Sequence, residues 1–155
     1  MAAPSKKTRP AIFTDVYLNN RTRQDLSPSE TKYWYGSENK QEDLPPEQIQ
    51  YFQHMADSDV GCSEGGVVFL IKQDIKWVVA WRNMVNEDNK VYTDITTESV
   101  INWDFYKKQL KKSVSHVQAE NLGFKATLNI DPYSVEPNVV GKLEETISSS
   151  HTLVV

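Results

Sequence analysis

The strongest candidates for ligand binding in this chain lie in one short run, NWDFYKKQLKKSV. It holds four lysines, Lys107, Lys108, Lys111 and Lys112, directly after Tyr106. Lysines beside an aromatic side chain suit docking on a membrane surface or on phosphate groups, because ammonium groups pair with phosphate while the ring enters the interface. The alternative is a helix that packs its apolar side on the fold and shows its lysines to water.

Aromatic residues form a second set of candidates, since the chain has four tryptophans and seven tyrosines. Tyr and Trp rings have an apolar body and a polar edge, which suits both sugar stacking and contact with lipid at an interface. Trp77 and Trp81 alternate in an apolar run and are predicted to lie in the core. The run TKYWY is predicted to place Tyr33 and Tyr35 on one face of a strand and Trp34 on the other, where all three are freer to bind.

Enzymatic chemistry has no clear carrier in the sequence. There is no motif of a P-loop, a dinucleotide fold, a zinc site or a nucleophile elbow, and the three histidines are far apart. Cys62 has no basic residue beside it that would activate its thiol. Asp57, Asp59 and Glu64 could surround a hard cation, but they lack EF-hand spacing. We therefore predict a protein that is not an enzyme, with no catalytic residue, no metal site and no cofactor.

Charge and cysteine content narrow the class of protein further. The net charge of -4 argues against a nucleic-acid binder with a basic surface, so nucleic acid is not an expected partner. A single cysteine excludes an intrachain disulfide, so packing alone must hold the fold. The start MAAPSKKTRP lacks the apolar core of a signal peptide. We expect a protein that is cytoplasmic as synthesised and that acts extracellularly if it is released.

Hydrophobic patterning predicts strands around a central stretch, residues 65–95. Within it, 67–71 is a continuous apolar run, while 77–82 and 91–96 alternate between apolar and polar residues. Gln73 and Asp74 are predicted to turn the hairpin between the first two runs. Further strands are predicted at residues 11–18, 31–35, 50–56 and 123–130.

One segment changes to a helical period. Trp103, Tyr106, Leu110 and Val114 recur at helical spacing and predict an amphipathic basic helix over about residues 102–114. The predicted fold class is mostly β, a two-sheet antiparallel β-sandwich with one short amphipathic helix before the last strand. The predicted domains are a disordered basic arm at 1–10, a single β-sandwich domain at 11–133 and a flexible C-terminal tail at 134–155.

The order of these segments resembles the actinoporin-like family, whose β-sandwich is shared with the fungal fruit-body lectins. The resemblance covers residues 11–130 and rests on YWYGS, GGVVFLI, WVVAWRN, NKVYTDI, NWDFYKKQLKK and KATLNI in that order. Family members that lyse membranes carry an amphipathic helix ahead of the first strand. Only residues 1–10 precede the first strand here, so the resemblance implies an actinoporin-like protein without the pore-forming N-terminal helix.

The resemblance also implies a head-group site, from which this chain departs. In place of the Ser-x-Pro-aromatic segment that family members use for phosphocholine, it has the residues 81–84, WRNM. Tyr106 matches the first tyrosine of the family's helix, but Leu110 and Lys111 replace the later pair. Lysines near Tyr106 would suit a phosphate or another anionic head group. The aegerolysins, compact lipid-binding β-sandwiches without an N-terminal helix, are a further family of similar architecture.

We therefore predict a non-enzymatic binding protein that recognises a membrane-lipid head group or a cell-surface glycan through one end of the sandwich. The alternatives are a glycan-binding lectin of the fruit-body type with a defence role, and a protein-interaction module that forms homo-oligomers through an exposed strand such as TKYWY. The predicted ligand-binding residues are Tyr106, Lys107, Lys108, Lys111, Arg82, Asn83, Tyr33 and Tyr35.

Overall fold

The structure of the protein is a computed structural model, which describes residues 7–146. Within these residues the chain forms nine strands and one helix. In chain order they are β1 (Phe13–Arg21), β2 (Ser27–Tyr35), β3 (Ile49–Met55), β4 (Ser63–Lys72), β5 (Ile75–Asn83), β6 (Lys90–Thr96), α1 (Trp103–Lys111), β7 (His116–Asn121), β8 (Phe124–Ile130) and β9 (Asn138–Glu145).

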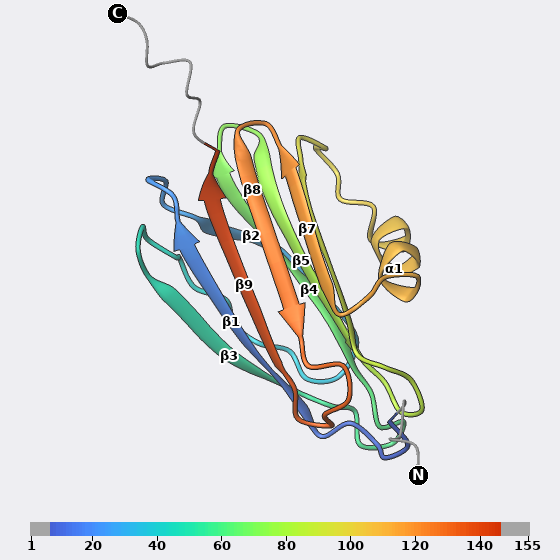
Figure 1. The fold of residues 1–155 in the computed structure, drawn as a ribbon. Helices are drawn as coiled ribbons and strands as arrows, with labels where there is room; N and C mark the ends of the chain where they lie inside the picture. Colours follow the sequence, from blue (N-terminus) through green and yellow to red (C-terminus); the bar gives the residue numbers. More distant parts are fainter. Residues whose placement is uncertain (1–6, 147–155) are drawn as a thin grey trace, which may run out of the picture.

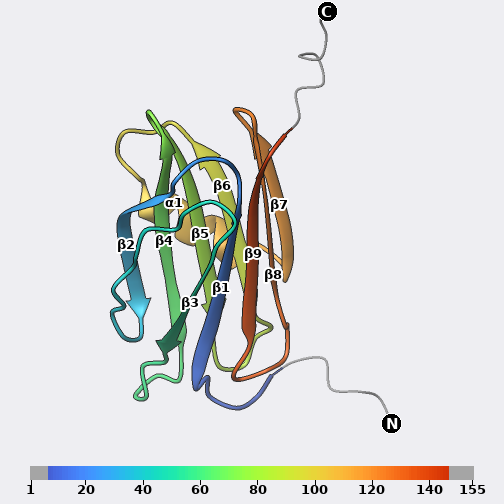
Figure 2. The same cartoon turned by 90° about the vertical axis from the view of Figure 1, so that its left-hand side faces the viewer.

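The strands form two sheets that pack face to face (Figures 1 and 2). A five-stranded sheet has the order β3-β1-β9-β8-β7, and a four-stranded sheet has the order β2-β4-β5-β6. Neighbouring strands are antiparallel except β1 and β9, which pair in parallel. The predicted fold class, a mostly β two-sheet sandwich with one short helix, is confirmed.

The core lies between the sheets and follows from the period-2 alternation of each strand. In β5 the side chains of Trp77, Val79 and Trp81 point inward and are fully buried, as predicted for both tryptophans. Val68 and Val78 point to the opposite face, yet they are also fully buried, because they pack under helix α1. The central strands are therefore apolar on both faces because a sheet covers one face and a helix covers the other.

Helix α1 lies against the outer face of the four-stranded sheet (Figure 1). It begins at an N-cap, Asn102, whose side-chain oxygen accepts a hydrogen bond of 3.1 Å from the backbone N–H of Phe105. Asp104 lies in its first turn, and Lys108 and Lys111 lie in its last turn, which matches the helix dipole. Among residues 7–146, no helix has the length and apolar composition needed to cross a membrane.

Three strands follow the helix, and two of them, β7 and β9, were not among the predicted strands. The prediction of a flexible tail at 134–155 is wrong over 138–145, because β9 is inserted between β1 and β8. Its inward residues Val139 and Leu143 are fully buried, and Gly141 lies between them where a Cβ would clash with Leu128 at 2.5 Å. The domain therefore extends to the end of β9, and the tail prediction beyond residue 146 falls outside the described residues.

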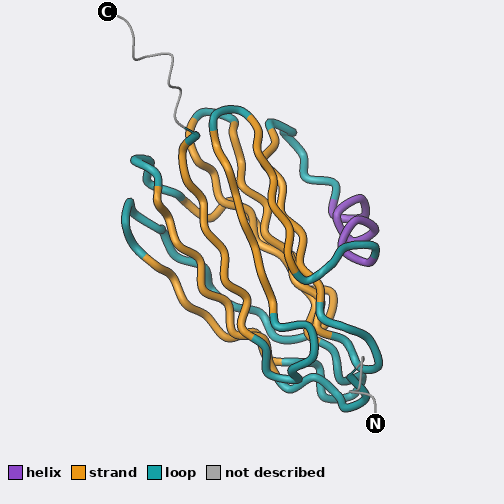
Figure 3. The backbone as a smooth tube through the Cα atoms, viewed as in Figure 1, coloured by secondary structure: helices purple, strands orange, loops and turns teal. Residues whose placement is uncertain are grey.

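The loops gather at the two ends of the sandwich (Figure 3), and the first described residues lie at the same end as the loop between β5 and β6. The predicted disordered arm at 1–10 is wrong at Lys7. Lys7 is only 4% exposed, and its ammonium donates hydrogen bonds to Asn83 and Asn89 on either side of that loop. The arm prediction for residues 1–6 falls outside the described residues.

Candidate functional site

Three side chains of helix α1 pack against the outer face of the four-stranded sheet. Tyr106 and Leu110 are buried, and Trp103 lies partly buried above Gly66 of β4. A Cβ on Gly66 would lie 2.7 Å from the Trp103 ring, so the glycine provides the space that the indole occupies. The indole N–H of Trp103 donates a 2.9 Å hydrogen bond to Glu30 of β2. The helix therefore reaches across to the edge strand of this sheet.

A β-bulge in strand β2 decides which aromatic rings face the helix. The pairing register with β4 shifts between Tyr33 and Tyr35, which makes Trp34 the extra residue. Tyr33 points into the sandwich, where its ring stacks on His54 at 5.1 Å and its hydroxyl donates to the carbonyl of Asn39. Trp34 and Tyr35 both lie near the helix residue Lys107. The prediction that Tyr33 and Tyr35 share a face is wrong, because the bulge breaks the alternation.

These residues form what we call the aromatic–lysine cluster, which is made of Trp34, Tyr35, Trp103 and Lys107. The Lys107 ammonium lies 5.7 Å from the centroid of the Trp34 ring and 5.6 Å from that of the Tyr35 ring. The rings of Trp34 and Trp103 meet edge to face with centroids 5.8 Å apart. All four side chains are half-buried, so the cluster presents rings and a cation to solvent at the same place.

The cluster continues into the exposed side of helix α1. Lys108, Lys111 and Lys112 are exposed, and Phe105 in the first turn is 45% exposed. Phe105 also lines a hollow of about 340 Å³ together with Asn102, Tyr106 and three residues of β6 and its following loop, Asp94, Thr96 and Glu98. The helix thus shows lysines near its C-terminal end and an apolar ring near its N-terminal end.

Tyr106 was predicted to contact a ligand, but its side chain is only 3% exposed. Its ring packs against the rings of Tyr92, Trp103 and Phe105, and its hydroxyl donates a 2.7 Å hydrogen bond to Asp94. Burial, followed by this hydrogen bond to a carboxylate, raises the pKa of Tyr106 far above the ordinary tyrosine value. Tyr106 therefore anchors the helix to β6 instead of facing solvent.

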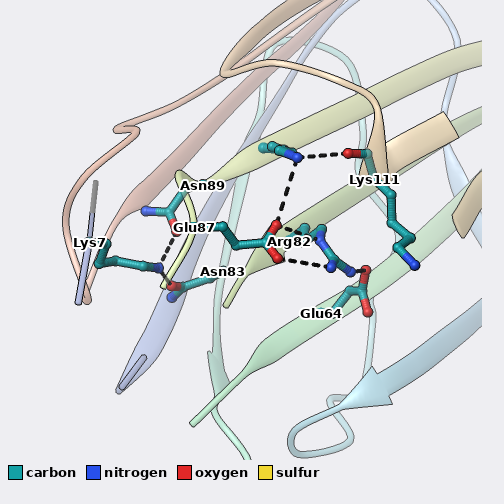
Figure 4. Close-up of polar contacts among 8 residues, drawn as sticks. Lys7, Glu64, Arg82, Asn83, Glu87, Asn89 and Lys111 are labelled. Atoms are coloured by element: carbon teal, nitrogen blue, oxygen red, sulfur yellow. Dashed lines mark hydrogen bonds and ion pairs between the residues drawn. The ribbon is translucent and has the colours of Figure 1, made fainter. Parts of the chain in front are cut away.

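Arg82 was also predicted to bind a ligand, and it is buried in an ion-pair network (Figure 4). Its guanidinium donates to Glu64 at 2.5 Å and makes two hydrogen bonds, of 3.0 and 3.1 Å, to Glu87. Lys90 contacts Glu87 at 3.7 Å and donates to the carbonyl of Lys111 at the end of α1. The network therefore joins the β4–β5 pair to the C-terminal end of the helix.

The charges in this network shift each other's pKa values. Burial lowers the pKa of Arg82, but hydrogen bonds and charges from Glu87 and Glu64 outweigh burial and raise it overall. Burial acts in the opposite direction on Glu87, and its contacts with Arg82 and Lys90 lower its pKa overall. Both groups stay ionised at neutral pH, and the prediction that Arg82 lines an open binding end is wrong, because its donors are used internally.

Asn83, the other residue predicted at this end, is fully buried in a chain of hydrogen bonds that crosses between the sheets. Its amide N–H donates to Thr14 at 3.2 Å, Thr14 and Ser63 are 2.8 Å apart, and Ser63 lies 2.7 Å from Nδ1 of His54. The indole N–H of Trp81 donates to the same Nδ1 at 3.0 Å. Since an indole N–H can only donate, Nδ1 is an acceptor and His54 is neutral.

Some residues of this surface were among the predicted ligand-binding residues, and others were not. Lys107, Lys108 and Lys111, which were predicted to bind a ligand, lie on helix α1, and the structure places Tyr35 of β2 beside Lys107. Trp103, which was predicted as a packing residue, joins them. Glu30 was not considered. In the sequence, Glu30 is distinguished only by its position three residues before the aromatic run 33–35. That position does not predict a contact with a helix that is distant in the sequence.

Comparison with known proteins supports the fold. No protein-family model and no curated protein sequence matches this chain. Among solved structures, its fold is shared with a lipid-binding protein. The crystal structure of the lipid binding protein Nakanori at 1.5 Å superposes with a TM-score of 0.78 and 15% sequence identity, over 86% of this chain and 71% of that chain. At this identity the likeness shows the fold alone, and the fold implied by the actinoporin-like resemblance is confirmed.

Proposed function

We propose that this protein is a non-enzymatic membrane-lipid binder, and that it docks on phosphate-bearing head groups through helix α1 and the aromatic–lysine cluster. The observation that carries the proposal is the position of Lys107 over Trp34 and Tyr35, beside the exposed Lys108 and Lys111. Rings with a polar edge settle at the membrane interface, and lysines near an anionic leaflet each contribute about 1 kcal/mol.

Two further observations support this function. Phe105 places an exposed apolar ring on the same helix, which suits shallow entry below the head groups. The structural neighbour with the same sandwich is described as a lipid binding protein. An enzymatic function has less support, because the side chains of His54 and Cys62 are both buried and do not face solvent.

Co-sedimentation with vesicles tests the proposal. We expect the wild-type chain to bind vesicles of phosphatidylcholine with phosphatidylserine more tightly than phosphatidylcholine alone, and less tightly as salt rises. Replacing Lys107, Lys108 and Lys111 by Gln together removes about 3 kcal/mol, so binding should weaken by about 100-fold.

The matched control removes the same charge elsewhere, by replacing Lys40, Lys72 and Lys125 by Gln. These lysines lie in the loop before β3, at the end of β4 and on β8, away from α1. Equal weakening by both triple variants would show that only net charge matters, and absence of binding to either vesicle would overturn the proposed function.

A further inference from the structure

The two sheets differ in how their outer faces are covered within the described chain. Helix α1 covers the four-stranded sheet, whereas no described helix lies over the outer face of the five-stranded sheet (Figure 2). A water-facing sheet surface is usually polar. Strands β3, β1 and β9 instead place large apolar side chains there, which are Tyr17 (36% exposed), Ile49 (62%), Tyr51 (50%), Met55 (43%) and Val140 (51%). Ile49, Tyr51, Tyr17 and Val140 are neighbours on this face, whereas Gln53 separates Met55 from Tyr51. Exposed apolar patches of this kind mark interaction surfaces.

The strand register places three of these side chains in one row. Tyr51 of β3 pairs with Tyr17 of β1, and Tyr17 pairs with Val140 of β9. The two tyrosine rings lie 4.9 Å apart. We call these three residues the tyrosine row. It runs across the strands, near the middle of this half of the sheet.

Polar neighbours orient Tyr51 within the tyrosine row. The hydroxyl of Tyr51 donates a 2.7 Å hydrogen bond to Asp15, and the side-chain amide of Gln53 donates to the same carboxylate oxygen at 3.1 Å. The hydrogen bond to Asp15 is the largest contribution that raises the pKa of Tyr51 to about 12, so the ring stays neutral. Side chains that are already ordered lose little entropy when they bind a partner.

We propose that this face is the interface of a symmetric homodimer, in which the tyrosine row packs on the same row of a second copy. A twofold axis that lies along the row puts Tyr17 on Tyr17, Tyr51 on Tyr51 and Val140 on Val140. The sheets then stack face to face, with their strands antiparallel. Tyrosines at the centre of such an interface are typical anchors of binding energy.

The charges beside the row are complementary under this symmetry. Asp15 lies on one side of the row, and Asn19 with its register partner Lys142 lies on the other side. The twofold axis brings Asp15 opposite Asn19 of the second copy, where Lys142 of that copy is the next residue across the sheet. Within its own chain Lys142 contacts Glu144 at 3.5 Å, in a solvent-exposed pair. A second copy adds the Asp15 carboxylate near the same ammonium, and this complementarity favours a second copy over an arbitrary partner.

The size of the face also suits a dimer. Five strands about 4.8 Å apart, with about seven residues each at about 3.4 Å, cover roughly 600 Å² before side-chain relief is added. A standard interface buries about 800 Å² per partner. The proposed axis leaves helix α1 on the two outer sides of the dimer, so the proposed lipid-binding surface stays open in both copies.

Sedimentation velocity of the full chain, from about 1 μM to about 200 μM, tests the dimer. We expect the mass to rise with concentration from 17.7 kDa towards twice that value. Tyr51→Lys should weaken association at least about tenfold, because it places a cation on the axis. The single changes Asp15→Lys and Lys142→Asp should each weaken association, and the double variant should restore it to within about threefold of the wild type.

Lys32→Asp, at an exposed position on edge strand β2 of the other sheet, is the matched control and should leave association unchanged. Circular dichroism of every variant confirms that the sandwich is intact. A mass of 17.7 kDa at all concentrations would overturn the dimer. Association that Tyr51→Lys leaves unchanged, or that the charge-exchanged double variant fails to restore, would overturn this interface.

Discussion

The ammonium of Lys107 lies between two consecutive residues of strand β2, 5.7 Å from the Trp34 ring centroid and 5.6 Å from that of Tyr35. A side chain of helix α1 thereby contacts edge strand β2, although the two segments are more than 70 residues apart in the sequence. A β-bulge makes this contact, because it turns Tyr35 to the same side as Trp34.

A double-mutant cycle on Lys107 and Trp34 should reveal this coupling. Each single change, Lys107→Ala or Trp34→Ala, removes the cation–ring contact, whose strength at an exposed site is about 0.5–1 kcal/mol. Urea unfolding of the four proteins should therefore give an interaction free energy of that size. Lys108→Ala in place of Lys107→Ala is the control. An interaction free energy indistinguishable from zero for the Lys107 pair would contradict the contact.

Trp103 should be displaced when Gly66 acquires a side chain. A Cβ at Gly66 would lie 2.7 Å from the Trp103 ring and 3.1 Å from the Val79 carbonyl, so Gly66→Ala forces the indole outward. We expect a destabilisation of about 1–3 kcal/mol and a red-shifted tryptophan emission. In a Trp103→Ala background the same change should be less destabilising. An equal effect in both backgrounds would show that the backbone, not the indole, is what Gly66 accommodates.

Loss of Arg82 should be severe, because it leaves the fully buried carboxyl group of Glu64 without its ion-pair partner. Removal of one partner of a buried ion pair typically costs about 3–5 kcal/mol. We expect Arg82→Met to lower the free energy of unfolding by about this amount, and Arg82→Met with Glu64→Leu to recover a large part of it. Chemical denaturation gives both values. A single variant within about 0.5 kcal/mol of the wild type would contradict the network.

Stability should fall on acidification between pH 6.5 and about 4 because of His54. Burial lowers the pKa of His54 from 6.5 to about 4 in the folded protein, so the unfolded chain binds its proton at a higher pH. Between these two values the unfolded state holds more protons, and the free energy of unfolding decreases as pH falls. The full effect is about 3 kcal/mol, and it is absent above pH 6.5.

The matched variant is His54→Gln, which cannot titrate in this range. Its free energy of unfolding should be lower than that of the wild type at pH 7 but should change less between pH 6.5 and pH 4. Thermal or urea unfolding at each pH provides the comparison. Parallel pH dependences for the two proteins would assign the acid sensitivity to other groups.

How far the sequence predicts this fold depends on the strength of each local pattern. The central strands and helix α1 were predicted because runs such as 67–71 and the spacing of Trp103, Tyr106 and Leu110 are strongly apolar and periodic. Strand β9 was missed because Pro132 and Pro137 precede it and Gly141 interrupts its short apolar run, which is typical of a tail. It becomes a strand through pairing with β1, which no local window can show.

The surface was predicted less completely, because most of it depends on contacts between distant segments. Exposed lysines on a basic helix could be read from the periodicity. The bulge at Trp34 and the burial of Arg82 against Glu64 depend on register and tertiary packing. Lys7 was assigned to a disordered arm because its segment is polar, although its ammonium is held by two buried asparagines.

The most direct test of the lipid-binding surface is a fluorescent reporter on helix α1. Cys62 is buried, so a cysteine introduced in place of the exposed Asp104 can be labelled selectively with an environment-sensitive dye. With phosphatidylserine-containing vesicles, we expect the emission to shift to the blue at Asp104→Cys and to stay unchanged at the control Gln118→Cys on β7. A shift at Gln118→Cys alone, or at neither position, would contradict membrane binding through α1.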